Sequence, residues 1–229
     1  MRRIVLYLNR LWTTDVGLTT LLVSLLTYVF FLNPLLEPGW ERLLGNVFFS
    51  IILIAGAIAV SRHRVLRTLV FSWGLLTFIF LWTWYLFPYR ILVYVNTCLA
   101  LVFLVLLTVL ILGQAFREGP TTSHRIMAAV AAYLILGVIW SQAYYLIALR
   151  IPGAFSVPGA VSPGDGEVLR SHLFYFSFIT LTTLGYGDIV PVHPMVRTLV
   201  ILEGVAGQLF PAILIARLVS LQVQSRQNT

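Results

Sequence analysis

The sequence predicts an all-α integral membrane protein with six transmembrane helices and one shorter, re-entrant helix. The first observation is composition: 59% of the 229 residues are hydrophobic and 10% are charged, whereas soluble domains carry about 25% charged residues. The second is length, because a spanning helix needs about 20 apolar residues and six apolar runs of roughly that length follow one another. The third is a seventh apolar stretch, residues 171–183, which is too short to cross a membrane. Together they exclude a soluble enzyme, a disulfide scaffold and a disordered protein.

Each predicted element has a local justification. Proline, glycine or arginine residues separate the apolar runs, and the aromatic residues that close the third run are typical of a membrane–water interface. The expected spans are residues 16–36, 43–60, 68–87, 91–112, 126–149 and 195–221.

The region between the last two spans has a different pattern. Residues 151–167 are rich in proline and glycine and predict a loop. Residues 171–183, SHLFYFSFITLTT, are apolar and aromatic but shorter than a span. Such a segment predicts a half-helix that enters the membrane and leaves on the same side.

The charges indicate orientation. The net charge is +7, and all 15 basic residues are arginines. With the N-terminus in the cytoplasm, ten arginines fall on the inner side and five on the outer side, which favours cytoplasmic N- and C-termini. The arginines are scattered through short loops, so they predict contact with the lipid bilayer and no nucleic-acid partner. The single cysteine, Cys98, excludes a disulfide within the chain.

The end of the predicted half-helix carries the motif Thr-Leu-Thr-Thr-Leu-Gly-Tyr-Gly-Asp at residues 180–188. Gly185 and Gly187 alternate with larger residues and open backbone conformations that other residues rarely adopt. Consecutive carbonyl groups can then point to one side, and a ring of such carbonyls can replace the hydration shell of a cation. A half-helix that enters from outside also directs its negative C-terminal end towards the membrane centre.

This motif resembles the selectivity filter of the potassium channel family, which reads Thr-Val-Gly-Tyr-Gly. The resemblance covers about residues 126–221 as outer helix, turret, pore helix, filter and inner helix. Four pore loops form one pore, so it implies a homotetramer with K⁺ ions in the filter and no organic cofactor. Leu184 stands where the family usually has Val or Ile. The implied K⁺-binding residues are Thr183, Leu184, Gly185, Tyr186 and Gly187, supported by Thr182 and Asp188.

The resemblance divides the chain into a four-span domain, residues 1–124, and a pore domain, residues 125–229. The four-span domain occupies the place of a voltage sensor. A sensor needs about three to four gating charges per subunit, but the fourth run contains no basic residue and only Arg90 stands at its edge. We therefore expect no steep voltage gating.

Four residues of the last run are further candidates for gating or for the inner cavity. Glu203 lies at membrane depth, where an ionisable residue indicates a function, although a buried packing role is the alternative. Gln208 lies about 140° around the helix from Glu203 and, by the resemblance, lines the cavity with Ile215. Gly207 and Pro211 can bend the helix as a gating hinge or as a fixed kink.

The expected function is passive K⁺ conduction across the plasma membrane, and no catalytic motif suggests an enzyme. We expect no large cytosolic domain, so gating is assigned to the membrane part, to lipid, to pH or to an unidentified regulatory partner. His172 and His193, which flank the filter, are either pH sensors or ordinary solvated histidines. The alternatives are a poorly selective cation channel, caused by Leu184, and a non-conducting regulatory subunit of another channel.

Overall fold

The computed structural model describes residues 16–32, 41–59, 64–87, 89–116, 123–157 and 166–227. The chain forms two compact units, residues 1–134 and residues 135–229. The boundary therefore falls inside one long helix, α6 (Ser123–Arg150), ten residues beyond the predicted domain boundary.

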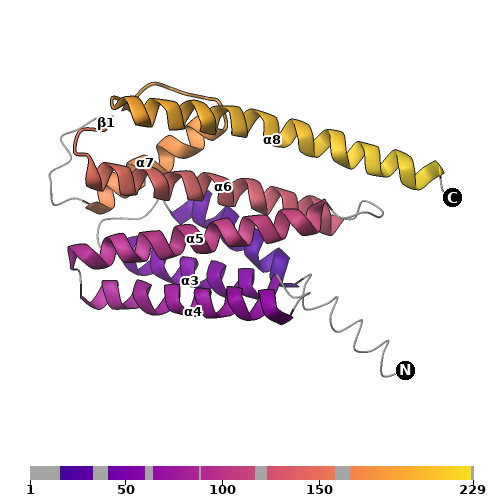
Figure 1. Ribbon diagram of the computed structural model, residues 1–229, viewed down its shortest axis with the longest axis horizontal. Helices are drawn as coiled ribbons and strands as arrows, with labels where there is room; N and C mark the ends of the chain where they lie inside the picture. Colours follow the sequence, from indigo (N-terminus) through magenta and orange to yellow (C-terminus); the bar gives the residue numbers. More distant parts are fainter. Residues whose placement is uncertain are drawn as a thin grey trace. The chain divides into compact units, whose positions relative to one another are not determined.

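The first unit consists of helices. An α-helix over residues 16–27 continues into a π-helical turn, η1 (Tyr28–Leu32). Helices α3 (Glu41–Ala59), α4 (Arg64–Leu86) and α5 (Arg90–Ala115) follow, then the first part of α6. α4 and α5 lie side by side across a short turn (Figure 1). Gly56 on α3 and Gly74 on α4 leave room for side chains of α5, because a Cβ at either position would contact Leu107 or Phe103.

The second unit contains the rest of α6, β1 (Phe155–Ser156), α7 (Gly166–Leu181), β2 (Val190–Pro191) and α8 (Pro194–Gln227). The two strands pair antiparallel, with Phe155 opposite Pro191, and were not predicted. The short helix α7 begins at Gly166, earlier than predicted, and ends at Leu181. Its earlier start is explained by Glu167, an acidic residue in the first turn, where the helix dipole favours negative charge.

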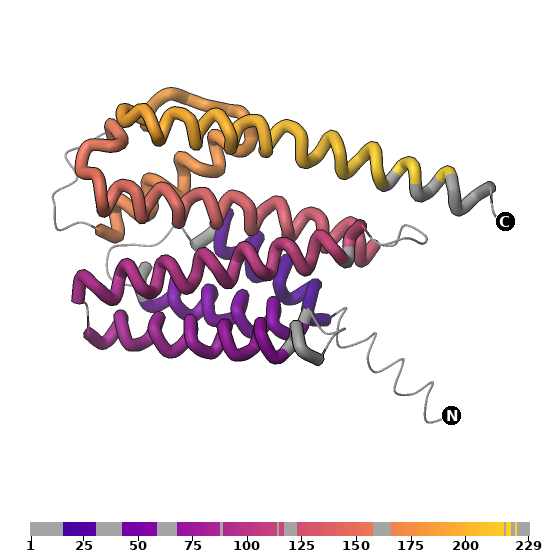
Figure 2. The backbone as a smooth tube through the Cα atoms, viewed as in Figure 1, coloured from indigo at the N-terminus to yellow at the C-terminus, as the bar shows by residue number. Residues whose placement is uncertain are grey.

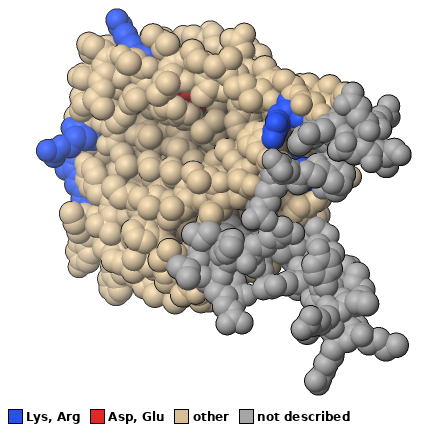
Figure 3. Space-filling view, turned by 45° about the vertical axis from the view of Figure 1, so that its right-hand side comes forward, with Lys and Arg blue, Asp and Glu red and all other residues tan. Residues whose placement is uncertain are grey.

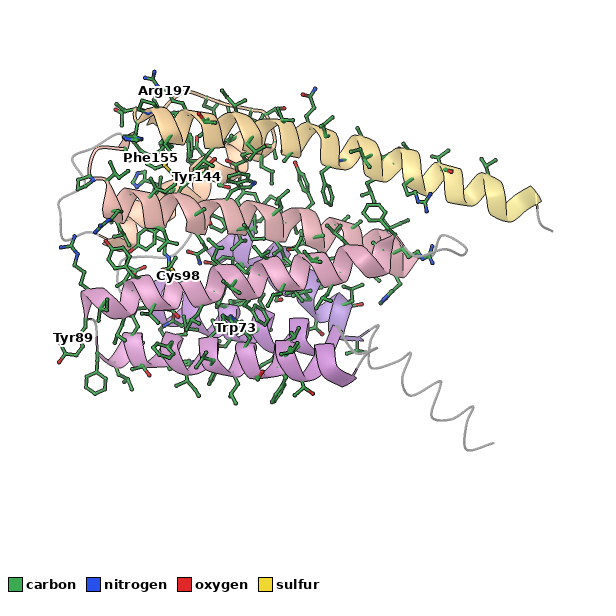
Figure 4. The ribbon with its side chains drawn as sticks, viewed as in Figure 1. Trp73, Tyr89, Cys98, Tyr144, Phe155 and Arg197 are labelled. Carbon is green, nitrogen blue, oxygen red and sulfur yellow. The ribbon has the colours of Figure 1, made fainter. Side chains whose placement is uncertain are left out.

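Aromatic side chains form the core of the second unit. Tyr144 on α6 is fully buried and stacks on Trp140 with ring centroids 5.9 Å apart. It also makes edge-to-face contacts with Phe155 (Figure 4) and with Phe176, each with 5.5 Å between ring centroids. Such edge-to-face pairs contribute about 0.5–1.5 kcal/mol beyond burial. This cluster joins α6, β1 and α7 and therefore fixes their packing within the unit.

Four helices among the described residues are long and apolar enough to cross a membrane: Thr68–Leu86, Arg90–Gly113, Ser123–Arg150 and Pro194–Arg217. Two further apolar helices, Val16–Phe30 and Leu43–Ile58, are shorter. On the face drawn in Figure 3, uncharged residues cover nearly all of the described surface and arginine side chains lie at its margins. The described chain is thus mostly helical and suited to a multi-pass membrane protein.

Candidate functional site

The site begins where α7 ends. The Thr183 amide donates to the Thr180 carbonyl at 2.9 Å, and the Leu184 amide donates to the Ile179 carbonyl at 2.9 Å. This pair of bonds is a Schellman motif, whose residue after the helix adopts the left-handed conformation and is usually glycine. Here that residue is Thr183, with φ of 60°. A β-branched residue in this region is strained, and such strain is concentrated at functional sites.

The segment after α7 alternates in backbone conformation. Thr183, Gly185 and Gly187 have φ of 60°, 53° and 78°, and no other described non-glycine residue has a positive φ. The segment runs back along α8 towards β2 (Figure 2). Among the described residues, no hydrogen bond is donated to a carbonyl of residues 183–187. Backbone carbonyls are obligatory hydrogen-bond acceptors, so this run of unpaired oxygens is available to a cation.

Hydrogen bonds hold the two ends of this segment. The Thr182 hydroxyl donates back to the Phe178 carbonyl at 2.6 Å, so it secures the end of α7. The Tyr175 hydroxyl on α7 interacts with the Asp188 carboxylate. Past Asp188, the amides of Val192 and His193 both donate to the Ala154 carbonyl, at 2.9 and 3.2 Å. The segment is therefore anchored to α7 at its start and to the α6–α7 connection at its end.

A buried carboxyl group on α8 contacts both α7 and α6. Glu203 on α8 has no exposed surface. Its Oε2 accepts a hydrogen bond from the Tyr144 hydroxyl at 2.6 Å, and its Oε1 lies 2.6 Å from Ser177 Oγ. Ser177 Oγ also lies 2.8 Å from the Gly137 carbonyl oxygen. Sequence analysis singled out Glu203 but neither partner, although a serine within the aromatic run of α7 is a recognisable signal.

Gly207 lies one turn after Glu203, where α8 approaches the backbone of α7. A Cβ at this position would overlap the Leu181 carbonyl group. Close helix approach therefore explains this glycine, and α8 continues without interruption through both Gly207 and Pro211. Gln208 is exposed on a different face from Glu203. The structure thus brings Glu203 and Gly207 to α7 and leaves Gln208 away from them.

The remaining candidates have ordinary local surroundings. His172 Nδ1 lies 2.7 Å from the Val168 carbonyl of its own helix, and His193 Nδ1 accepts a hydrogen bond from the Met195 amide at 3.3 Å. Arg90 is exposed at the start of α5. Among the described residues, no group of three or more His, Cys, Asp or Glu side chains is placed to hold a metal ion.

Comparison with known proteins supports a channel. Residues 132–224 match the model of a family described as Ion channel, a region that extends from α6 into α8. A 50-residue stretch is 46% identical to potassium channel subfamily K member 18 of Mus musculus and makes up 21% of this chain and 13% of that protein. No solved structure matches the chain. Both similarities point to a potassium-channel-like pore and not to an enzyme.

Proposed function

We propose that this chain is a subunit of a K⁺-selective channel that conducts K⁺ passively across the plasma membrane. The observation that carries the proposal is the run of unpaired carbonyls at residues 183–187, with its alternating backbone conformation. Dehydrated K⁺ ions pass between rings of these oxygens, which bind tightly enough to replace water and weakly enough to release the ion. Thr183, Leu184, Gly185 and Tyr186 provide the carbonyls, and Gly187 shapes the outer mouth.

The channel is a homotetramer, because each chain supplies one such segment and a closed ring requires four. The surface of α8 supports assembly. Its apolar side chains are largely exposed in the single chain, with Ile201 68%, Ile213 58% and Ile215 61% accessible. On a membrane-spanning helix such apolar side chains face either lipid or a neighbouring subunit, so this surface is open to assembly. In the tetramer these helices surround the inner cavity, and Gln208 faces it.

The four-span unit gives no steep voltage dependence. In this proposal the two shorter apolar helices also cross the bilayer, which gives six spans with both termini in the cytoplasm. The described part of α5 carries one arginine, Arg90, at its exposed first position. Steep gating uses about three to four charges per subunit. The stimulus therefore acts through the pore unit, through lipid or through a separate partner.

The decisive test is ion flux. The purified protein is reconstituted into K⁺-loaded liposomes, and K⁺ and Na⁺ fluxes are measured for the wild type and for Gly185→Asp. We expect K⁺ flux that excludes Na⁺ and is abolished in Gly185→Asp, because Gly185 has a positive φ and its carbonyl belongs to the filter. Gly45→Ala is the matched control, since a Cβ there meets open space.

The other outcomes identify the alternatives. Equal K⁺ and Na⁺ flux would indicate a poorly selective cation channel, in which the branching of Leu184 loosens the filter. An assembled wild-type tetramer that passes no ions would contradict the proposal. The chain would then be a regulatory subunit of another channel.

A further inference from the structure

The buried carboxyl group of Glu203 has an arrangement that the proposed conduction does not explain. It lies inside α8 at a depth where charged groups are costly, and the side chain is fully buried. Among the described residues it forms hydrogen bonds and no ion pair; its contacts are the hydroxyls of Tyr144 and Ser177. An isolated buried carboxylate without a cationic partner is strongly unfavourable.

The number of available protons distinguishes the ionised form of Glu203 from the protonated form. Three short oxygen–oxygen contacts meet here: Tyr144 with Glu203 at 2.6 Å, Ser177 with Glu203 at 2.6 Å, and Ser177 with the Gly137 carbonyl at 2.8 Å. All three distances fit O–H···O hydrogen bonds. Each hydroxyl supplies one proton, and a carbonyl supplies none. An ionised Glu203 leaves two protons for three contacts, whereas a protonated Glu203 provides the third.

The contacts then form one directed chain. Tyr144 donates to Glu203, the protonated carboxyl donates to Ser177, and Ser177 donates to the Gly137 carbonyl. Every polar atom in the chain is satisfied, and no charge is buried. The chain runs from α6 through α8 to α7 and returns to α6.

Glu203 and Gly207 both contact α7, at positions one helical turn apart. Glu203 and Gly207 are four residues apart on α8, and the residues they contact, Ser177 and Leu181, are four residues apart on α7. Residues at this spacing share one face of a helix. α8 therefore holds α7 at two points one turn apart, and the second point is two residues before Thr183, where the carbonyl segment starts.

We propose that Glu203 is a protonated, hydrogen-bond-donating positioning residue that locks α7 between α6 and α8 and thereby holds the carbonyls of residues 183–187 in their conducting geometry. This role rests on the proposed channel function for its effect on conduction, but the protonation of Glu203 does not. A displacement of α8 breaks these hydrogen bonds. It also moves Leu181 and, with it, the start of the carbonyl segment at Thr183.

The first test is infrared spectroscopy of the full chain in lipid nanodiscs at neutral pH. Only 8 of the residues are acidic, and carboxylates in water are ionised at this pH. We expect a carbonyl stretch of a protonated carboxyl group in the wild type, and its loss in Glu203→Gln. A wild-type spectrum without that band would overturn the assignment.

The second test compares Glu203→Gln with Glu203→Met in K⁺ flux and in thermal melting of the assembled protein. Glutamine is the matched control, because its amide donates to Ser177 and accepts from Tyr144 as the protonated acid does. We expect Glu203→Gln to keep flux within about twofold of the wild type, and Glu203→Met to lose at least about tenfold. Glu203→Met protein that assembles and conducts like the wild type would overturn the positioning role.

The two proposals fail separately. If the wild type conducts no K⁺, the channel proposal fails, and the infrared band still decides the protonation of Glu203. The melting comparison still tests whether Glu203 holds α7 in place. If it does, Glu203→Met must melt well below Glu203→Gln. Equal melting temperatures for the two variants would overturn it.

Discussion

Buried hydroxyl groups find their partners differently in the two units. In the first unit, Ser24, Thr77 and Thr97 donate to carbonyls three or four residues earlier in their own helices, at 2.9, 2.9 and 2.7 Å. In the second unit, Ser141 also donates within its own helix, at 2.8 Å, but Tyr144 and Ser177 make their short contacts with Glu203 on another helix. Two cross-helix bonds of the first unit come from indoles: Trp73 donates to the Leu99 carbonyl at 3.1 Å, and Trp82 donates to Ser50 Oγ at 3.4 Å.

The difference shows which interactions position the helices in each unit. A hydroxyl that bonds within its own helix is satisfied wherever that helix lies, so it does not select a neighbour. The helices of the first unit are therefore positioned by packing, as at Gly56 and Gly74, and by the two indole hydrogen bonds. A cross-helix chain is satisfied in one arrangement only. The second unit uses such a chain where it must hold an extended segment with unpaired carbonyls.

The largest effect is expected for Gly207→Ala. The added Cβ overlaps the backbone carbonyl of Leu181, which cannot rotate away as a side chain could. Overpacking costs about 1–3 kcal/mol and occasionally more, and we expect the upper end of that range. Thermal melting and the yield of assembled protein in detergent measure the loss.

Gly204→Ala is the matched control for this substitution. It lies on the same helix, and its Cβ would meet open space. Alanine is a better helix former than glycine by up to about 1 kcal/mol, so the melting temperature should stay the same or rise. Equal melting of the two variants would show that α8 does not approach α7 at Gly207.

The next largest effect is expected for Ser177→Ala. Its comparison with Ser24→Ala tests the contrast between the two units. Both serines are buried. Ser177→Ala leaves an oxygen of Glu203 and the Gly137 carbonyl without this partner, which costs about 1–3 kcal/mol. Ser24→Ala removes a bond within one helix and should change stability by less than about 0.5 kcal/mol. Similar losses in a melting comparison would remove the proposed distinction.

A smaller effect is expected for Tyr175→Phe, which removes the interaction of the Tyr175 hydroxyl with Asp188 beside residues 183–187. The side chain is exposed, so folding should be unaffected while K⁺ flux falls by about twofold. Asp188→Asn keeps an acceptor oxygen and should conduct more nearly like the wild type. Liposome flux for the three proteins decides the point, and an unchanged Tyr175→Phe flux would exclude a role for this interaction in the filter.

The smallest effect is expected in the first unit, for Arg90→Gln. One exposed charge at the start of α5 senses little of the transmembrane field, whereas each charge that crosses it contributes about 2.3 kcal/mol per 100 mV. Current–voltage relations of the variant and the wild type should superimpose. A clear shift of the voltage dependence would assign a sensing role to the first unit.

Hydropathy predicted the helices well because it depends on composition along the chain. α4, α5 and α6 lie close to the predicted runs, and the break before α7 was also expected. The start of α7 at Gly166 was missed, because the glycine- and proline-rich composition before it predicted a longer loop. The β1–β2 pair was missed because two-residue strands leave no periodic pattern.

By itself, the sequence determined the membrane class, the presence of a short helix before the last long one, and the glycine pattern that permits alternating conformations at residues 183–187, since these depend on local composition and on the absence of a Cβ. The tertiary structure alone decided that Tyr144 and Ser177 meet Glu203, and that Gly207 serves close approach to Leu181. Ser177 and Glu203 are 26 residues apart, and Tyr144 and Glu203 are 59 apart. Contacts over such separations depend on how helices pack, and no local pattern of residues encodes that packing.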